Sequence, residues 1–566
     1  MIHKYNSMQR LIQPIVITLL LLASIPDFLY AQKQKSFSVE NIQSGKPKLV
    51  VGIVVDQMRY DYLFRYWNKY TENGFKRLVN EGFLLKDANY NYIPTYTGPG
   101  HACVYTGTTP AVNGIVSNDW YDRASKKMVY CVEDTTMHPV GTHASSSRAS
   151  AHRLLTTTVT DELRLSNNFQ SRVIGIALKD RGAVLPAGHT GNAAYWFDKE
   201  TSNWVTSSYY MTELPQWANE FNGRKYADEL MKDKWTTLLP IEQYTESSAD
   251  NVRYEGLYSG EIQPVFPHDL PKIKLKDKDL IKKVPMGNTF TKDFAEAVLK
   301  GEQLGKGSFT DFLAVSFSST DYVGHQFGIN AVETEDTYLR LDRDLAEFLE
   351  FLEKWCGHGN YLLFLTADHG AANNVLYSSD QNIPAGIFNA KQADSLLENY
   401  LTTLYGAGEF VTELSSHGIY LDHALLDQKK IPLDEIQKKC AAFLMKMDGV
   451  SVALTSEEMK KGNCKEGMAS LMQRGFNAER SPDVILSLDP AWMELDSQTG
   501  TTHGAGYSYD THVPLLFYGW NVPHGSSVEP VSITDVAPTI ASMLNIEFPS
   551  GTTGKPVSSL LNFYSK

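Results

Sequence analysis

Cysteine is scarce in this chain, with only five among 566 residues. Their positions, Cys103, Cys131, Cys356, Cys440 and Cys464, form neither a CxxC pair nor a zinc-finger pattern, which excludes a zinc ribbon and a disulfide-dense scaffold. An oxidising compartment would allow at most two bridges, and a pairing of Cys440 with Cys464 is permitted without being indicated.

Long apolar runs are also rare. Beyond the N-terminal segment, no stretch approaches the roughly twenty apolar residues that span a membrane. Residues 1–31 hold Lys4 and Arg10 before a short apolar run and end on a small residue, a pattern that predicts a signal peptide. We therefore expect a periplasmic or secreted protein with no membrane span in its mature form. Retention of the segment as an anchor is the alternative.

The chain has no excess of basic residues. It has 52 Lys and Arg against 65 Asp and Glu, a formal net charge of −13, which argues against nucleic acid as a partner. With 42% hydrophobic residues the composition is that of a globular protein with a large core.

Apolar strands alternate with helical patterns along the sequence. Residues 49–55 are apolar on both faces, as is typical of a buried parallel strand. Further strands are expected at 171–178, 309–316, 361–366, 483–488 and 513–518. The alternation predicts an α/β fold, a three-layer sandwich with a mostly parallel central sheet. We expect one domain over 32–566, with insertions at about 183–307 and 382–480.

The first candidate functional residue is Thr97, within TGPGH. Pro99 is tolerated in a first helical turn, so a helix is expected to begin here. The free amides and positive dipole end of a helix favour an alkoxide or a phosphate, so Thr97 can serve as a nucleophile if a base or a metal removes its proton. A simple N-cap is the alternative.

Carboxylate and imidazole side chains follow the predicted strands, at the edge where α/β sheets place their ligands. They are Asp56, Asp321, His325, Asp368, His369 and His503. Three carboxylates and three imidazoles suit two metal ions with open positions; zinc is the better assignment, and manganese, iron or cobalt stay open. The preference for His503 over His512 is weak on chemistry alone. His101 and His512 are candidates for supporting roles only.

Two basic residues follow the strand at 171–178. In extended backbone Lys179 and Arg181 point to one side while Asp180 points away, which suggests an anion between them. Two solvated side chains at a strand end are the alternative. Asn118, in a polar loop beyond the Thr97 helix, is either an amide donor or a turn residue.

Together these segments resemble the alkaline phosphatase superfamily, most of all its periplasmic phosphate-irrepressible alkaline phosphatases with a threonine nucleophile. The motifs occur in the family's order and span nearly the whole mature chain: IVVDQMRYDYL, PTYTGPGH, SNDW, LKDRGA, STDYVGH, TADHG and GTTHGAGYSYDTHVPLLFYG. The family's choice of a histidine followed by glycine favours His503.

The resemblance implies an alkaline-phosphatase-like fold and two zinc ions per chain. One ion would be held by Asp321, His325 and His503, and the other by Asp56, Asp368 and His369, with Thr97 bound to the second as an alkoxide. Thr97 would attack phosphorus and give a phosphothreonine, which is then hydrolysed.

By the same resemblance, Asn118, Lys179 and Arg181 would bind the remaining phosphoryl oxygens. A monoester carries two negative charges there, which a Lys and Arg pair compensates. The expected enzyme is an alkaline phosphatase acting on a broad range of small-molecule phosphate monoesters, with a monomer favoured. Alternatives are a phosphodiesterase or nucleotide pyrophosphatase of the same superfamily and a non-catalytic periplasmic phosphate or metal binder. A sulfatase is disfavoured because TGPGH lacks a Cys-x-Pro-x-Arg type motif.

Overall fold

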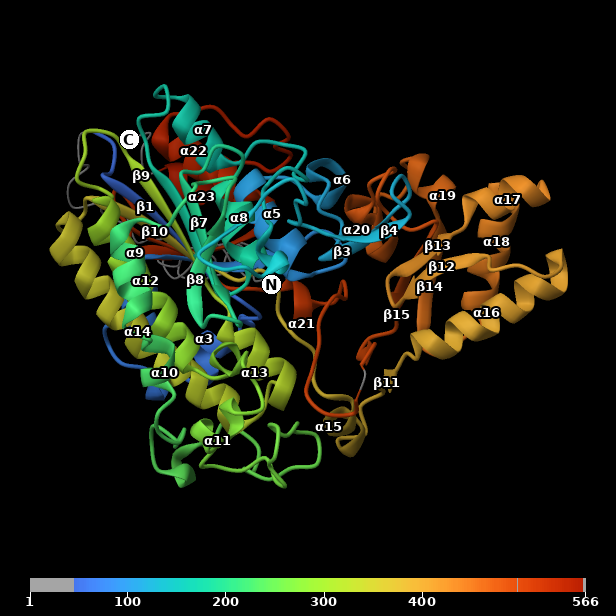
Figure 1. Cartoon of the computed structure of the whole chain (residues 1–566), viewed down its shortest axis with the longest axis horizontal. Helices are drawn as coiled ribbons and strands as arrows, with labels where there is room; N and C mark the ends of the chain where they lie inside the picture. The colour runs from blue at the N-terminus through green and yellow to red at the C-terminus, as the bar shows by residue number, and fades with distance from the viewer. Residues whose placement is uncertain (1–44, 496, 563–566) are drawn as a thin grey trace, which may run out of the picture. The chain divides into compact units, whose positions relative to one another are not determined.

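The computed structural model describes residues 45–495 and 497–562 (Figure 1). The predicted signal peptide, residues 1–31, lies outside the described residues. A ten-stranded sheet has the order β18-β2-β17-β10-β1-β9-β6-β7-β8-β5. Its edge strand β18 spans Gly525–Ser532 and pairs in parallel with β2. No helix of the described residues is long and apolar enough to cross a membrane.

The middle of this sheet is parallel. Its neighbouring strands pair in parallel in the order β10 (Tyr361–Thr366), β1 (Leu49–Val55), β9 (Asp311–Phe317), β6 (Val173–Ala177) and β7 (Ala193–Asp198). Every residue of these five strands is buried, which explains their continuous apolar runs. Antiparallel strands flank them: β17 (Leu515–Gly519) joins β10 to β2 (Phe83–Asn89), and β8 (Asn203–Ser207) joins β7 to β5 (Pro139–Val140).

Helices cover both faces of the sheet (Figure 1). On one side lie α5 (Thr97–Thr106), α7 (Val159–Leu165), α8 (Asp180–Ala187) and α22 (Val536–Leu544); on the other lie α12 (Met286–Glu302), α13 (Ser319–Phe327) and α14 (Val332–Cys356). In α14 the buried Leu341, Leu345, Phe348 and Leu352 recur at helical spacing, so one stripe packs on the core. The predicted three-layer α/β sandwich with a mostly parallel sheet is confirmed.

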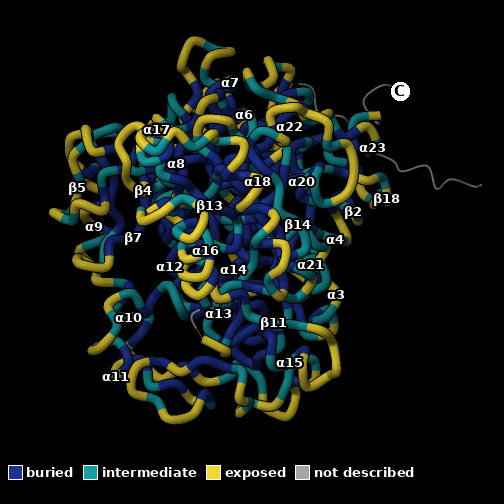
Figure 2. Tube along the Cα trace, turned by 90° about the vertical axis from the view of Figure 1, so that its right-hand side faces the viewer, coloured by how far each residue is buried: buried dark blue, intermediate teal, exposed yellow. Residues whose placement is uncertain are grey.

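A second, antiparallel sheet has its own core. It has the order β12 (Val411–Ser415), β13 (Gly418–Leu421), β15 (Val484–Leu488), β14 (Val450–Thr455), and it packs with α16 (Ala390–Tyr405) and α18 (Leu433–Leu444). The strand expected at 483–488 therefore exists, but it pairs with β13 and β14 and not with the main sheet. Figure 2 shows the buried residues in the interior and the exposed ones on outer turns and loops.

Two other expectations concern the first insertion and the cysteines. Strands β7 and β8, from the segment expected as an insertion at about 183–307, belong to the main sheet; the extents of both insertions stay predictions. All five cysteines are free, so the permitted bridge between Cys440 and Cys464 is absent.

Candidate active site

The site lies at the carboxyl ends of four adjacent strands. Asp56 follows β1, Asp368 and His369 follow β10, Asp321 lies in the first turn of α13 after β9, and Lys179 comes directly after Leu178 at the end of β6. Because β10, β1, β9 and β6 are neighbours in the sheet, their ends meet at one edge. Residues spread over some three hundred positions are thereby brought together.

Two groups of side chains could each hold a metal ion. Asp56, Asp368 and His369 form one, and Asp321, His369 and His503 form the other; in each, the possible ligand atoms lie within 4.8 Å of one another. His325 adjoins the second group, since its Nε2 lies 3.1 Å from Oδ1 of Asp321. His369 therefore lies between the two groups, and its ring stacks on that of His503 at 3.4 Å.

The imidazoles are oriented by backbone carbonyls. His325 donates from Nδ1 to the carbonyl oxygen of Thr501 at 2.8 Å, and His503 donates from Nδ1 to that of Thr95 at 2.7 Å. Asp321 and His325 are four residues apart in α13, which places them on one helical face. The Nε2 atoms of both histidines thus face the cluster, as the second-sphere bonds of metal ligands commonly arrange.

Burial sets the charge states of the cluster. Burial and the nearby Asp321 raise the pKa of Asp56 to about 6, and burial and Asp56 likewise raise the pKa of Asp368. Burial lowers the pKa of His503 to about 3 and, together with His503, also lowers that of His369. His369 and His503 are therefore neutral, with a lone pair free at Nε2, while the carboxylates repel one another. His325 differs, because Asp321 outweighs the effect of burial and raises the pKa of His325.

This donor set fits divalent cations. Among the described residues, Oδ1 of Asp56 and Oδ2 of Asp368 are buried without a hydrogen-bond partner, although a buried carboxylate oxygen left unpaired is costly. A cation bound between them would satisfy both oxygens. Oxygen and nitrogen donors without thiolate suit zinc as well as manganese, iron or cobalt.

Thr97 is the first residue of α5 and is 1% exposed. Its Oγ1 lies 3.5 Å from Nε2 of His369. A Cβ on Gly100 would lie only 2.4 Å from the carbonyl oxygen of Asp368, so glycine is what lets the first turn of α5 approach the end of β10. The start of α5 thus places the hydroxyl of Thr97 beside the metal-binding groups.

The amides of this first turn are largely engaged. The N–H of Gly98 donates to Oδ1 of Asn118 at 2.8 Å, that of Gly100 to the carbonyl of Tyr96 at 2.8 Å, and Pro99 has none. The amides of Gly98 and Gly100 are therefore not free, unlike the free amides expected at this helix start. Nδ2 of Asn118 stays available as a donor beside the start of α5.

Lys179 is the central cation of the site. Its Nζ lies 2.6 Å from Oδ2 of Asp56 and 2.6 Å from Oδ2 of Asp321, and it donates to Oγ1 of Thr97 at 3.4 Å. Burial acts against ionisation of Asp321, but His325 and Lys179 hold the pKa of that carboxyl well below its usual range. The ammonium group is thus fixed between the two metal-binding groups and the candidate nucleophile.

Arg181 reaches the same hydroxyl from a different direction. Its Nη2 donates to Oγ1 of Thr97 at 3.5 Å, and its Nη1 donates to the phenol oxygen of Tyr130 at 3.1 Å. Extended backbone was predicted to bring Lys179 and Arg181 together, and this reason is wrong. Lys179 is the extended N-cap of α8, but Arg181 already lies in the first turn of that helix. The two cations converge because a helix begins between them.

The structure also separates the two histidines of the GTTHGAGYSYDTHV motif. His503 joins the cluster, whereas His512 donates from Nε2 to the carbonyl of Lys86 at 2.9 Å and stacks on Tyr60. His101 is buried and donates from Nδ1 to the carbonyl of Thr97 at 2.9 Å. His101 thus holds the start of α5, whereas the side chain of His512 contacts Lys86 and Tyr60.

Gln57 was missed by the sequence analysis. Its backbone N–H donates to Oδ1 of Asp368 at 3.1 Å, and its Nε2 donates to Oδ1 of Asp321 at 2.8 Å, so it bridges the two metal-binding groups. Its φ of 63° makes this double contact possible. The only available signal was its place directly after Asp56.

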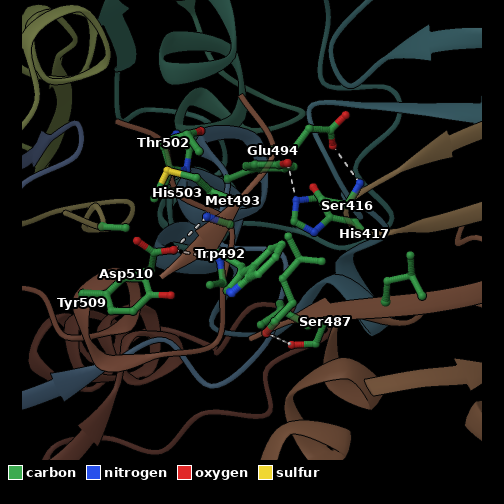
Figure 3. A pocket seen from close by; sticks show the side chains of 17 residues that line it. Ser416, His417, Ser487, Trp492, Met493, Glu494, Thr502, His503, Tyr509 and Asp510 are labelled. Atoms are coloured by element: carbon green, nitrogen blue, oxygen red, sulfur yellow. Dashed lines mark hydrogen bonds between the residues drawn. The ribbon is translucent and has the colours of Figure 1, made fainter. Parts of the chain in front are cut away.

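Tyr96 and His417 were also missed. Their side chains share a hydrogen bond between Oη and Nε2. Both line a cavity of about 250 Å³. Figure 3 shows His417 and His503 in its wall. Asp510 lines it too and accepts from the N–H groups of Gly504 and Ala505 at 2.9 and 2.8 Å, which fixes the loop that carries His503.

Known proteins resemble this chain over most of its length. A family model described as "Type I phosphodiesterase / nucleotide pyrophosphatase" matches residues 50–511. The chain is 46% identical over 520 residues to a Myroides odoratus protein named calcium-transporting ATPase, and 45% identical over 518 residues to alkaline phosphatase PafA of Elizabethkingia meningoseptica. Each match covers 91% of this chain and 95% of the relative.

The fold has a similarly close counterpart. A crystal structure of alkaline phosphatase PafA superposes with a TM-score of 0.89 at 44% identity, covering 92% of this chain and 99% of that one. Fold and similarity together define a member of the alkaline phosphatase superfamily. Within it, the chain belongs to the type I phosphodiesterase and nucleotide pyrophosphatase family.

Proposed function

We propose that this protein is a zinc-dependent phosphomonoesterase that releases inorganic phosphate from a broad range of small-molecule monoesters through a phosphothreonine at Thr97. The observation that carries the proposal is the convergence of Lys179 and Arg181 on Oγ1 of Thr97, at 3.4 and 3.5 Å. Two cations beside one hydroxyl match the two charges of a monoester's non-bridging oxygens. The named phosphatase relative, PafA, supports the same activity.

Seven residues would hold two zinc ions. One set is Asp321, His325 and His503, and the other is Asp56, Asp368 and His369 with the hydroxyl of Thr97. When bound, paired metal ions stabilise negative charge on the attacking and leaving oxygens of an in-line displacement.

The protein's own residues perform the binding and the attack. Lys179, Arg181 and Nδ2 of Asn118 bind the phosphoryl oxygens and orient phosphorus toward Oγ1 of Thr97. Oγ1 forms a bond to phosphorus as the ester oxygen departs, and the hydroxyl proton lost by Thr97 is matched by the one the alcohol gains. Water then attacks the phosphothreonine, which returns the threonine hydroxyl and releases phosphate.

Two alternatives are weaker. A phosphodiesterase or nucleotide pyrophosphatase would share the metal-binding residues, but it must seat a second organic group where Lys179 and Arg181 lie. A phosphate or metal binder without activity would be expected to lack Thr97 or one of the ligands, and this chain retains them all.

The remaining proposals concern the setting of the enzyme. We place it in the periplasm or outside the cell after removal of residues 1–31, acting as a monomer. The segment at about 382–480 is proposed as an insertion that shapes substrate access, since Ser416 and His417 line the cavity beside His503.

The test is the ratio of monoester to diester hydrolysis, measured with matched aryl phosphates on mature, zinc-loaded protein and on a chelated control. A large monoester preference that disappears with the metal is expected. A diester preference would overturn the roles given to Lys179 and Arg181. No metal-dependent hydrolysis of either ester would overturn the enzyme itself.

A further inference from the structure

The cavity beside His503 adjoins the candidate active site, because His503 belongs to both. Its wall includes Tyr96, which is bonded to Thr97 along the chain, and His503, whose Nε2 lies 3.6 Å from Oδ1 of Asp321. The ring of Tyr96 lies 5.5 Å from that of His503. An alcohol esterified to a phosphoryl group at Thr97 therefore has this cavity within reach.

Tyr96 and His417 also line a second cavity of about 180 Å³. Its wall includes Ser117 and Asp119, the neighbours of Asn118, but none of the proposed metal ligands. In an in-line displacement the leaving oxygen departs opposite the nucleophile and needs its charge stabilised. The cavity that contains His503 is thus the one suited to the leaving group.

Its size suits a small group. A volume of about 250 Å³ lies below the roughly 300–1,000 Å³ of pockets that enclose drug-sized ligands. The indole of Trp492 and the phenol ring of Tyr509 contribute aromatic surface (Figure 3). The phenol ring of Tyr96 also belongs to a residue that lines the cavity. Aromatic faces attract ammonium groups as well as apolar ones.

The charge of the wall is one-sided. Among the described residues that line the cavity there is no Lys or Arg, whereas Glu494 and Asp510 both contribute carboxyl groups. Asp510 already accepts from two backbone N–H groups, and burial raises the pKa of Asp510 to about 7, so Glu494 is the carboxylate that remains for a ligand. Oε2 of Glu494 accepts from the backbone N–H of Ser416 at 2.7 Å, and none of the ion pairs among the described residues includes Glu494. Burial lowers the pKa of His417 to about 4, so this imidazole adds no positive charge.

We propose that this cavity binds the alcohol portion of the monoester and that Glu494 selects leaving groups that carry a cationic amine. Neutral alcohols of equal size bind through the aromatic wall alone, and anionic ones are repelled. The inference rests on the proposed monoesterase function and adds the substrate class that the site prefers: phosphate esters of small amino alcohols.

The test uses three monoesters of similar size: 2-aminoethyl phosphate, propyl phosphate and phosphoglycolate, with a cationic, a neutral and an anionic leaving group. Values of kcat/KM are measured for the wild type, Glu494→Gln and Glu494→Lys at low and high salt. The control is Glu413→Gln, which removes an exposed carboxylate that lines only the second cavity. Comparing variants with the wild type cancels the intrinsic reactivity of each ester.

Glu494→Gln is expected to lower the preference for 2-aminoethyl over propyl phosphate by about fivefold, as for a partly exposed ion pair. Glu494→Lys should reverse the order of 2-aminoethyl phosphate and phosphoglycolate, and Glu413→Gln should change neither. A preference that Glu494→Gln leaves unchanged would overturn the inference.

A binding measurement separates the inference from the function on which it rests. Affinities of the same three esters for zinc-loaded Thr97→Ala are measured by calorimetry, with and without Glu494→Gln. We expect 2-aminoethyl phosphate to bind more tightly than the other two esters, and we expect Glu494→Gln to remove this difference. If no ester is turned over by the wild type, the proposed function fails; if the three bind Thr97→Ala equally, the leaving-group selection fails.

Discussion

The Nζ of Lys179 lies 3.4 Å from the hydroxyl oxygen of Thr97, although the two residues are 82 positions apart in the chain. Thr97 opens α5 and Lys179 caps α8, so the two helix starts meet at the edge of the sheet. In the proposed function, this meeting would supply both a nucleophile and the positive charge that a doubly charged phosphoryl group needs.

The first prediction concerns this charge. Replacing both Lys179 and Arg181 with Ala should lower kcat/KM for an aryl monoester by about a thousandfold, since two charge-assisted contacts are lost in a buried site. A matched diester, which carries one charge fewer, should lose much less. Lys232→Ala, at an exposed residue paired with Glu229, is the control. Equal losses on both esters would remove the substrate-class argument.

How far the sequence predicts this site is clear from Lys179 and Arg181. Their convergence was predicted from the alternation of an extended strand, yet it arises from the start of α8. Strand ends and motif order were enough to identify the six proposed metal ligands, because parallel strands bring their carboxyl ends to one edge. They could not show that His369 lies between the two groups.

Contacts that depend on backbone geometry could not be predicted from the sequence. Gln57 bridges Asp321 and Asp368 only because its φ is 63°, a value that no local pattern specifies. The strand Val484–Leu488 was predicted from its apolar run, but its pairing with β13 and β14 depends on residues far away in the sequence. Local patterns define elements; long-range pairing decides which sheet they join.

The second prediction tests Gln57 as a positioning residue. Gln57→Asn tolerates the positive φ and keeps the backbone bond to Asp368, but its shorter side chain loses the bond to Asp321. Zinc affinity, measured by competition with a chelator, should fall by about tenfold, as is usual when a metal ligand loses its supporting bond.

A matched control exists for this variant. Gln303 also has a positive φ, of 53°, and caps the end of α12 outside the site. Gln303→Asn should leave zinc affinity unchanged. Wild-type zinc affinity in Gln57→Asn would show that the bond to Asp321 does not position the metal site.

The third prediction concerns a buried ion cluster. His268 is fully buried, with Nδ1 2.8 Å from Oε1 of Glu261 and Nε2 3.1 Å from Oε1 of Glu333. Burial lowers the pKa of His268, but the hydrogen bonds to Glu261 and Glu333 outweigh it and raise the pKa to about 9. Since an unfolded histidine titrates near 6.5, the folded state holds its proton more tightly.

The pH dependence of the free energy of unfolding follows from this difference in pKa. The stabilisation from protonated His268 is fully present below about pH 6.5 and is lost as the pH rises through about 9. His268→Gln should therefore lower the free energy of unfolding by about 3 kcal/mol at pH 6 and by much less above pH 9. Denaturant unfolding at several pH values measures this loss of free energy, and His358→Gln, at an exposed residue, is the control. A loss that is constant with pH would contradict the ionised cluster.

Phosphoryl transfer to Thr97 is the step on which the other roles depend. The most direct measurement is acid quenching of zinc-loaded enzyme during monoester turnover, followed by mass spectrometry of the peptide that contains Thr97. A phosphorylated Thr97 is expected in the wild type, and Thr97→Ala should bind zinc normally yet show almost no turnover. Substantial turnover by Thr97→Ala, with no phosphorylated residue in the wild type, would rule out the covalent mechanism.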